Sequence, residues 1–344
     1  MKRVKKLATP PTFLSYAAVG GYEESLGPLG DAFDLCDPSD SFGQRTWESS
    51  EGEMGRSAVN IALTKAGLSH TDPELIIAGD LQNQCVASSG GVASFGIPFL
   101  GVYGACSTCT EALLLASLMS ESEFSSLTVT LTTSHNSAAE RQFRTPLEYG
   151  GQRTPSAQWT ATAAGAFILT TREELLSGKR GLAKITEVMA GRIIDGATAD
   201  GSNMGAAMAF AAADSIISFF SSSEVSPSSV DYIVTGDLGY VGSDILRDIL
   251  KEKLPAAAGR HIDCGTLLYD RCARDVHAGA SGCGTSASVL AAYFLPNIAA
   301  GDIRRILFLS TGALMSPSSV LQGNNILGIA PAVLIEHFEG GNNL

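Results

Sequence analysis

A cysteine stands where a reactive group would be well placed, in the segment GVYGACSTC (101–109). Cys106 lies among small residues, directly before an apolar run with helical character (107–119). The N-terminus of a helix favours negative charge through its free N–H groups and its dipole. A nucleophilic cysteine needs such help, or an adjacent base. Cys106 is therefore either a nucleophile or a group that lines a binding pocket.

The other cysteines argue against zinc and redox chemistry. The chain has seven cysteines at irregular spacing, which favours reduced thiols and the cytosolic side of a membrane. Cys106 and Cys109 form one C-x-x-C pair, but no second Cys or His pair follows at the spacing of a structural zinc site. We expect neither a zinc site nor a redox pair.

Composition excludes several classes of function. The chain has 344 residues, 45% of them hydrophobic and 17% charged, which is typical of a globular protein with a sizeable core. Its formal net charge of −12 argues against a nucleic-acid partner. The basic N-terminus, MKRVKK, is expected to be a solvated tail. The sequence has no run of about 18 apolar residues, so we expect no membrane-spanning helix.

An internal repeat organises the chain. PELIIAGDLQNQ (73–84) matches VDYIVTGDLGYV (230–241), and each follows an apolar helical run (57–68 and 205–220). The next pairs of matching segments are two buried helices (104–119 and 279–295), two β-rich runs (126–135 and 304–313) and two apolar strands (162–171 and 328–337). The boundary between the halves falls between residues 173 and 174, giving domains 1–173 and 174–344.

The repeat predicts an α/β fold in layers. Near-continuous apolar strands joined by helices are typical of sheets that are covered on both faces. The helices of 104–119 and 279–295 are apolar all round, so they are expected to lie buried at the centre. Two halves related by a pseudo-twofold axis then give five layers, α/β/α/β/α.

The halves differ at one long polar segment, NSAAERQFRTPLEYGGQRTPSAQWTA (136–161). It carries Arg141, Arg144 and Arg153, and the matching segment of the second half (314–327) is about half as long. Long insertions in compact domains are usually functional or disordered. We therefore expect part of the site here.

Six segments carry a resemblance to the thiolase superfamily, which includes the ketoacyl-ACP synthases. They are GVYGACSTC (101–109), SHNSAAERQFR (134–144), EYGGQ (148–152), QWTATAAGA (158–166), TGDLG (235–239) and STGALMSP (310–317). Within the superfamily the chain resembles a non-enzymatic sporulation family over almost its whole length. The resemblance implies the duplicated five-layered fold, with Cys106 in the place of the catalytic cysteine.

The resemblance also implies a function. Members of the sporulation family bind dipicolinic acid (pyridine-2,6-dicarboxylate), alone or as its calcium complex. We expect a peripheral protein of the forespore or spore inner membrane, acting with integral membrane subunits of one channel in import during sporulation and release at germination. Relatives pair edge to edge through a strand of the N-terminal half, which implies a homodimer, with the third-strand region (126–135) and the long insertion as the candidate contacts. No resident cofactor is expected, and calcium would arrive with the ligand.

The partners of a catalytic cysteine are missing from the sequence. Thiolase-type enzymes carry His, and a second His or an Asn, in their C-terminal half. Here the segment 235–242 contains no His and 279–288 contains neither His nor Asn, while His277 follows Asp-Val instead of standing in a Gly-His-Pro motif. Without a base, the proton transfers of a condensation have no carrier. We expect a binding protein that is not an enzyme; the alternative is an acyltransferase that uses Cys106 with an unrecognised base.

A flat dianion needs planar donors, hydroxyl or amide groups and an apolar slot. Ser134, His135 and Asn136 follow the third strand at its carboxyl end, where ligands of α/β sheets gather. Arg141 and Arg144 would share one helix face. The predicted ligand-binding residues are Cys106, Ser107, Ser134, His135, Asn136, Arg141, Arg144, Gln152, Arg153, Asp237 and Cys283, with Asp237 a candidate to help hold calcium.

Each assignment has an alternative that leaves the ligand out. Arg141 and Arg144 are also suited to surface or dimer contacts, or to ion pairs with Glu140 and Glu148. His135 and Asn136 are also suited to fixing their loop. Asp80 and Asp237 occupy matching places in the two halves and are both suited to capping N–H groups after a strand.

Overall fold

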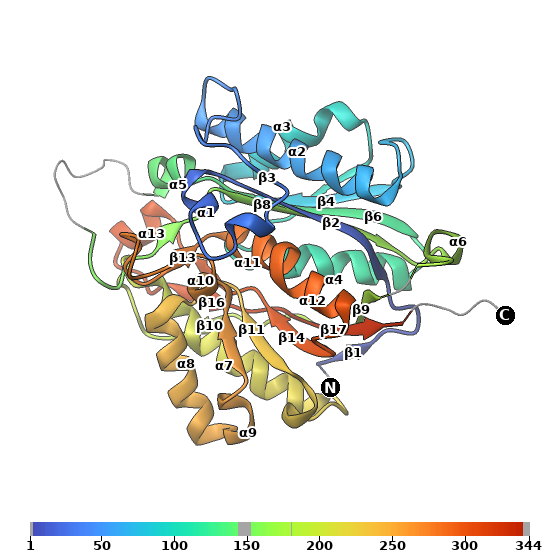
Figure 1. Ribbon diagram of the computed structural model, residues 1–344. Helices are drawn as coiled ribbons and strands as arrows, with labels where there is room; N and C mark the ends of the chain where they lie inside the picture. Colours follow the sequence, from blue (N-terminus) through green and yellow to red (C-terminus); the bar gives the residue numbers. More distant parts are fainter. Residues whose placement is uncertain (1–2, 144–152, 180, 340–344) are drawn as a thin grey trace.

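A computed structural model describes residues 3–143, 153–179 and 181–339 (Figure 1). In the first half the strands are β1 (Lys5–Lys6), β2 (Thr12–Gly20), β3 (Leu35–Cys36), β4 (Leu75–Gly79), β5 (Phe99–Gly101), β6 (Leu127–Ser134), β7 (Trp159–Thr160) and β8 (Ala163–Thr170). The helices are α1 (Tyr22–Ser25), α2 (Trp47–Ala66), α3 (Val86–Val92), α4 (Thr108–Glu121), α5 (Asn136–Phe143) and α6 (Glu173–Leu176).

The second half repeats the pattern. Its strands are β9 (Leu182–Met189), β10 (Ile194–Asp195), β11 (Tyr232–Thr235), β12 (His261–Asp263), β13 (Ala280–Ser281), β14 (Arg305–Leu309), β15 (Gly312–Leu314), β16 (Leu327–Ile329) and β17 (Ala332–Phe338). Its helices are α7 (Met204–Ser222), α8 (Gly239–Lys253), α9 (Pro255–Ala258), α10 (Cys264–Leu267), α11 (Cys283–Val289), α12 (Leu295–Ala300) and α13 (Pro317–Leu321). A π-helical turn over Leu290–Phe294 joins α11 to α12.

The predicted five layers are confirmed (Figure 1). α2 and α3 cover one sheet layer, α4, α11 and α12 fill the middle, and α7 and α8 cover the other sheet layer. The main strands form one hydrogen-bonded path in the order β12-β11-β14-β17-β9-β2-β8-β6-β4-β5. The two layers join where β2 pairs with β9 at Thr12–Lys184 and Phe13–Ala183.

The middle layer is apolar because it is enclosed by both sheets. Leu113 and Ala116 of α4 and Ala287 and Val289 of α11 are each at most 3% exposed, with Phe294 of the π-turn beside them. The predicted central position of these helices is therefore confirmed. The polar contacts that remain join the halves: Ser310 Oγ accepts from Thr110 Oγ1 at 2.9 Å and lies 3.0 Å from Ser286 Oγ.

The long insertion begins as helix α5, as the sequence predicted for residues 137–143, and ends as strand β7. β7 pairs with β13 of the second half, so the insertion links the two halves. Arg144 and Gln152 lie outside the described residues. The third strand, β6, lies between β8 and β4, so it has no free edge for pairing with another subunit.

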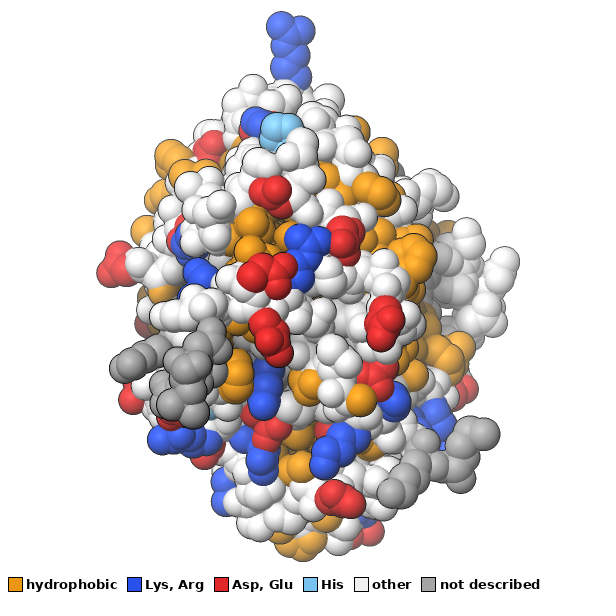
Figure 2. All heavy atoms as spheres, turned by 90° about the vertical axis from the view of Figure 1, so that its right-hand side faces the viewer, with side chains coloured by type: hydrophobic (Ala, Val, Ile, Leu, Met, Phe, Trp, Pro, Cys, Tyr) orange, Lys and Arg blue, Asp and Glu red, His pale blue; other side chains and the backbone are white. Residues whose placement is uncertain are grey.

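The surface carries mixed charge. On the face shown in Figure 2, Lys and Arg side chains gather in the lower half and alternate with Asp and Glu, with hydrophobic side chains between them. Among the side chains drawn in colour on this face, no continuous basic stripe is present. Within the described residues one helix, α7, is long and apolar enough to cross a bilayer, but it packs on the sheet and 56% of its apolar window is buried.

Close packing of α11 on β8 depends on Gly165. A Cβ at this position would lie 2.5 Å from the backbone carbonyl carbon of Ala287. Gly165→Ala should destabilise the protein by about 1–3 kcal/mol, because neither the strand nor the buried helix can yield freely. Gly90→Ala is the matched control: Gly90 lies in α3 with open space around it, and this change should be neutral or slightly stabilising. Urea unfolding of both variants measures the difference, and equal effects would contradict it.

Candidate functional site

Cys106 lies in the turn that leads into α4. The turn is tight: Ala105 has a left-handed backbone (φ +52°), and the Thr108 hydroxyl donates to the Ala105 carbonyl at 2.7 Å. Ser107, a predicted ligand-binding residue, uses its hydroxyl locally, donating to the Gly104 carbonyl at 2.7 Å and to Glu111 Oε1 at 3.1 Å. The turn holds the Cys106 side chain in the interior, where the residue is 5% exposed.

Asp237 is the closest acidic partner of Cys106. Its carboxylate accepts from the Gly282 N–H at 2.9 Å and from the Thr311 hydroxyl at 3.0 Å, and the Cys106 thiol also lies within hydrogen-bonding reach. Cys106 is in turn within reach of the Gly282 N–H. These residues come from four separate elements, so the turn after β11 and the start of α11 close around the thiol of the first half. The structure thus places Asp237 beside the Cys106 thiol, and Asp237 also accepts from the Gly282 N–H at the start of α11.

The electrostatics of this pair oppose nucleophilic chemistry. Burial, and secondly the neighbouring Asp237, raise the pKa of Cys106 well above the ordinary value for a thiol. Burial also raises the pKa of Asp237 to about 7, partly offset by its hydrogen bonds. An activated cysteine needs a lowered pKa, which an imidazolium supplies and a carboxylate cannot. At neutral pH the sulfur therefore keeps its proton.

A cysteine of the second half, Cys283, lies beside Cys106. Cys283 starts α11 and shares one buried apolar cluster with Cys106, Leu81 and Ala139. Its Sγ donates to the Thr133 carbonyl at 2.9 Å. Ser134, the next residue, donates to the Ala161 carbonyl at 2.7 Å and accepts from the Gly284 N–H at 3.2 Å. The structure thus brings four predicted site residues together: Cys106, Cys283, Asp237 and Ser134.

His135 and Asn136 fix their own loop, which was the alternative given for them. His135 Nε2 lies 2.9 Å from the Asp40 carbonyl, and its ring lies 5.3 Å from the Trp47 ring. Burial lowers the pKa of His135, so its ring is neutral at pH 7. Asn136 Nδ2 donates to the Thr160 carbonyl at 3.1 Å. The polar atom that stays unpaired is His135 Nδ1, which is buried.

The two described arginines have partners away from the thiols. Arg141 forms an ion pair with Glu48 at the start of α2. Arg153 donates to the Asp275 backbone carbonyl, and its guanidinium lies 4.9 Å from the centre of the Trp159 ring. The alternative given for Arg141 was a surface contact or an ion pair, and the pair with Glu48 is of this type. The sequence predicted that Arg141 and Arg153 share a ligand site with Arg144 and Gln152, and the last two lie outside the described residues.

Two buried carboxyl groups near Cys283 were not predicted as site residues. Glu51 of α2 accepts from Gln82 Nε2 at 2.5 Å and from the Thr133 hydroxyl at 2.9 Å. Asp80 accepts from the Gln82 N–H at 2.8 Å and the Ser88 N–H at 2.7 Å. Burial, followed by the charge of Asp80, raises the pKa of Glu51 to about 8. The place of Asp80 in the repeat was a usable signal; Glu51 had none, because its contacts are distant in sequence.

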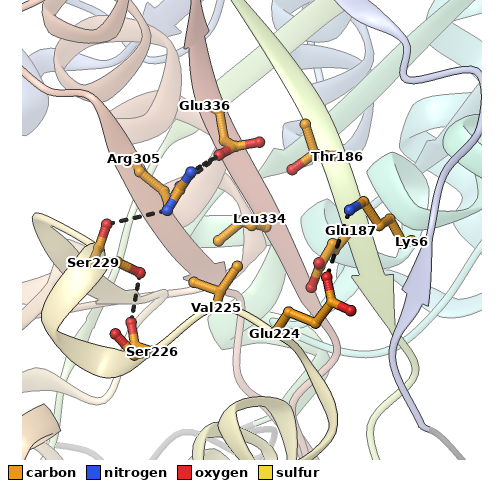
Figure 3. Close-up of a pocket in the computed structure, with 10 residues that line it drawn as sticks. All are labelled: Lys6, Thr186, Glu187, Glu224, Val225, Ser226, Ser229, Arg305, Leu334 and Glu336. Atoms are coloured by element: carbon orange, nitrogen blue, oxygen red, sulfur yellow. Dashed lines mark hydrogen bonds and ion pairs between the residues drawn. The ribbon is translucent and has the colours of Figure 1, made fainter.

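The described residues contain no group of three or more His, Cys, Asp or Glu side chains arranged to hold a metal ion. A separate surface hollow of about 390 Å³ lies over β9, β14 and β17 and is lined by charged pairs such as Arg305–Glu336 and Lys6–Glu224 (Figure 3). None of the predicted site residues lines this hollow. The predicted site residues that the structure brings together are therefore those of the buried cluster around Cys106.

Comparison with solved structures places this geometry in a known fold. 3-Oxoacyl-[acyl-carrier-protein] synthase III from Aquifex aeolicus VF5 superposes with a TM-score of 0.58 at 15% identity, covering 95% of this chain and 99% of that one. A variant of OleA from Xanthomonas campestris gives a TM-score of 0.61 at 11% identity, covering 96% and 100%. These similarities establish the thiolase-like fold, and at such low identity they establish nothing about activity.

Sequence comparison gives the family. The chain is 38% identical over 333 residues to Stage V sporulation protein AD of Bacillus subtilis (strain 168), covering 96% of both proteins. The family model for Stage V sporulation protein AD (SpoVAD) matches residues 1–336. The resemblance expected from the sequence motifs is confirmed. The chain belongs to the Stage V sporulation protein AD family, a family of sporulation proteins with a thiolase-like fold.

Proposed function

We propose that the protein is a non-catalytic binding subunit whose ligand site is formed by the buried residues around Cys106. The observation that carries the proposal is the partner of this thiol: a buried carboxyl group, Asp237, in place of an imidazole. This partner keeps the proton on the sulfur and supplies no positive charge to an acyl oxyanion. The fold keeps the place of the nucleophile while its surroundings disfavour the reaction.

The proposed ligand is dipicolinic acid, free or as its calcium complex, on the strength of family membership. The chemistry of the pocket bears on which form fits. Asp237, Asp80 and Glu51 are buried carboxyl groups near the two thiols, and a dianion beside them is tolerated only if charge is neutralised. Calcium carried by the ligand neutralises charge through carboxylate oxygens, and protonation of Asp237 does so without metal.

The proposed location is the cytosolic surface of the spore inner membrane, in a channel assembly with integral membrane subunits that imports the ligand during sporulation and releases it in germination. Sporulation is the part that family membership supports. A layered fold in which α7 packs on the sheet suits a peripheral subunit.

A homodimer through β5 is the proposed oligomer. β5 is an edge strand of the sheet, and exposed apolar side chains surround it: Val86 is 50%, Leu100 39% and Tyr103 45% exposed. Two copies of β5 related by a twofold axis would continue the sheet and cover these side chains.

The first prediction concerns the Cys106 thiol. At pH 8 it should react with iodoacetamide far more slowly than the exposed Cys272, because its pKa is held high. Asp237→Asn removes the negative neighbour, so the Cys106 rate should rise about 3–10-fold. The rise should appear only above pH of about 7, where Asp237 is ionised in the parent protein. Peptide mass spectrometry measures both sites, and equal labelling of Cys106 and Cys272 in the parent protein would contradict the assignment.

Ligand binding is tested by calorimetry with dipicolinate, with and without calcium, and with isophthalate (benzene-1,3-dicarboxylate), which lacks the ring nitrogen, as the control. Dipicolinate should bind at saturable sites. Cys106→Ala and Ser134→Ala should weaken binding about 3–10-fold, the effect of one lost polar contact, while Cys272→Ala should leave it unchanged. Absence of saturable heat would end the ligand assignment. The second candidate function is an acyltransferase, which the thiolase-like fold favours. Incubation with acyl-CoA followed by mass spectrometry tests it, and a thioester on Cys106 would support it.

Dimer formation is tested by sedimentation velocity over a concentration series. Leu100→Glu should weaken dimerisation at least about tenfold, because it buries a charge at the paired edge. Phe124→Glu, at a residue 68% exposed after α4, should have no effect. A parent protein that is monomeric at every concentration would refute the dimer.

A further inference from the structure

The two outer helices that match in the repeat, α2 and α7, have different outer faces. The outward residues of α2 are mostly polar and include Glu53, Arg56, Asn60 and Lys65. The residues of α7 that are not fully buried include the exposed Phe210 and three partly buried apolar residues whose other side packs on the core, Met204, Ile217 and Phe220, with Asp214 the charged one. Phe210 is 40% exposed. An outer helix of a lone globular domain normally carries a polar stripe, as α2 does.

Neighbouring elements extend this apolar surface. Ile193 before β10 is 51% exposed, Leu321 of α13 is 88% exposed and Leu327 of β16 is 36% exposed. β10 and β16 adjoin α7: Leu327 pairs with Asp195 of β10, and a Cβ at Gly196 would lie 2.7 Å from the Phe210 ring. α13 lies beside the loop before α7, since a Cβ at Gly201 would lie 3.9 Å from Val320 Cγ1. We call the set Met204, Phe210, Ile217, Phe220, Ile193, Leu321 and Leu327 the α7 surface.

The charges on this surface that form no ion pair within the described residues are acidic. The sequence has no Lys or Arg between residues 193 and 246, nor between 306 and 344. Asp195 and Asp200 are exposed among the apolar residues. Asp214 is paired with Arg3 and Arg192, which lie at the border of the surface. The occupant that complements an apolar surface with an acidic rim is apolar and basic.

We propose that the α7 surface docks a basic, amphipathic juxtamembrane segment of a membrane-embedded partner. The proposal rests on the proposed function as a peripheral subunit. Cytoplasmic segments that flank transmembrane helices are enriched in Lys and Arg, so they supply the charge that this surface lacks. A second copy docking by the same surface would bring acidic rims together, and an anionic lipid surface would meet the same repulsion.

Flotation of the purified full-length chain tests the proposal. The probe is inside-out inner-membrane vesicles from spores that lack this chain, with protein-free liposomes of the extracted lipids as the second arm. The chain should float with the vesicles, and should neither float with the liposomes nor with vesicles that have been treated with protease. Raising the salt from 0.05 to 0.5 M should reduce the bound fraction several-fold, because it screens the acidic rim.

Matched variants locate the contact. Phe210→Ser combined with Leu321→Ser should reduce flotation about tenfold, and Asp195→Asn combined with Asp200→Asn should remove its salt dependence. Phe124→Ser, the control at an exposed aromatic residue after α4, should float like the parent chain. Equal binding to bare liposomes would assign the surface to lipid, and undiminished flotation of the Phe210/Leu321 variant would place the partner elsewhere. Either result overturns the proposal.

The same variants are titrated with dipicolinate, because none of the changed residues belongs to the Cys106 cluster. Unchanged ligand binding with lost flotation supports the docking site. Lost ligand binding in the parent chain with normal flotation refutes the proposed ligand and leaves the docking site standing, so the two failures are distinguishable.

Discussion

The structure depends on burying two helices whose surfaces are largely apolar. α4 and α11 lie between two sheets, and each contact must be closed by small residues because both neighbours are rigid. Gly165 shows how close the approach is, since even one methyl group there would collide with the backbone of Ala287. Among the buried polar groups of this layer, Thr110 of α4 and Ser286 of α11 are both bonded to Ser310, which ties the two halves together. The central helices therefore fix the position of both sheets and of both helix starts.

This constraint explains why the fold was predictable from the sequence. Helices that are apolar all round and strands without polar alternation are typical of elements covered on every face, so they predict buried layers. The repeat showed which segments of the two halves correspond. It also explains why Cys106 and Cys283 meet: Cys106 lies in the turn before α4, Cys283 starts α11, and both helices lie in the middle layer. Asp237 joins them because the turn after β11 is placed against the start of α11 by the Gly282 N–H.

The rest of the site could not be predicted because its partners come from segments with no pattern. His135 is held by the Asp40 carbonyl and Trp47, and Arg141 by Glu48, all within a stretch before or at the start of α2 whose path no periodicity indicates. Glu51 looks in the sequence like one more polar residue of an outer helix, yet it is 1% exposed and bonded to Gln82 and Thr133. Contacts between side chains that are distant in sequence depend on the paths of the loops, and these paths cannot be predicted from the types of the individual residues.

Two residues that match in the repeat, Asp80 and Asp237, have different hydrogen-bond partners. Asp80 and Asp237 occupy equivalent places, but Asp80 accepts from the nearby N–H groups of Gln82 and Ser88, whereas Asp237 reaches across to Gly282 and the Cys106 thiol. The fold tolerates either arrangement because its stability comes from the apolar middle layer. The reactivity of Cys106 depends instead on which group faces it, since a carboxylate raises the pKa of a thiol and an imidazolium lowers it. In this chain burial, and secondly Asp237, hold the pKa of the Cys106 thiol high within an architecture that it shares with solved structures at 11–15% identity.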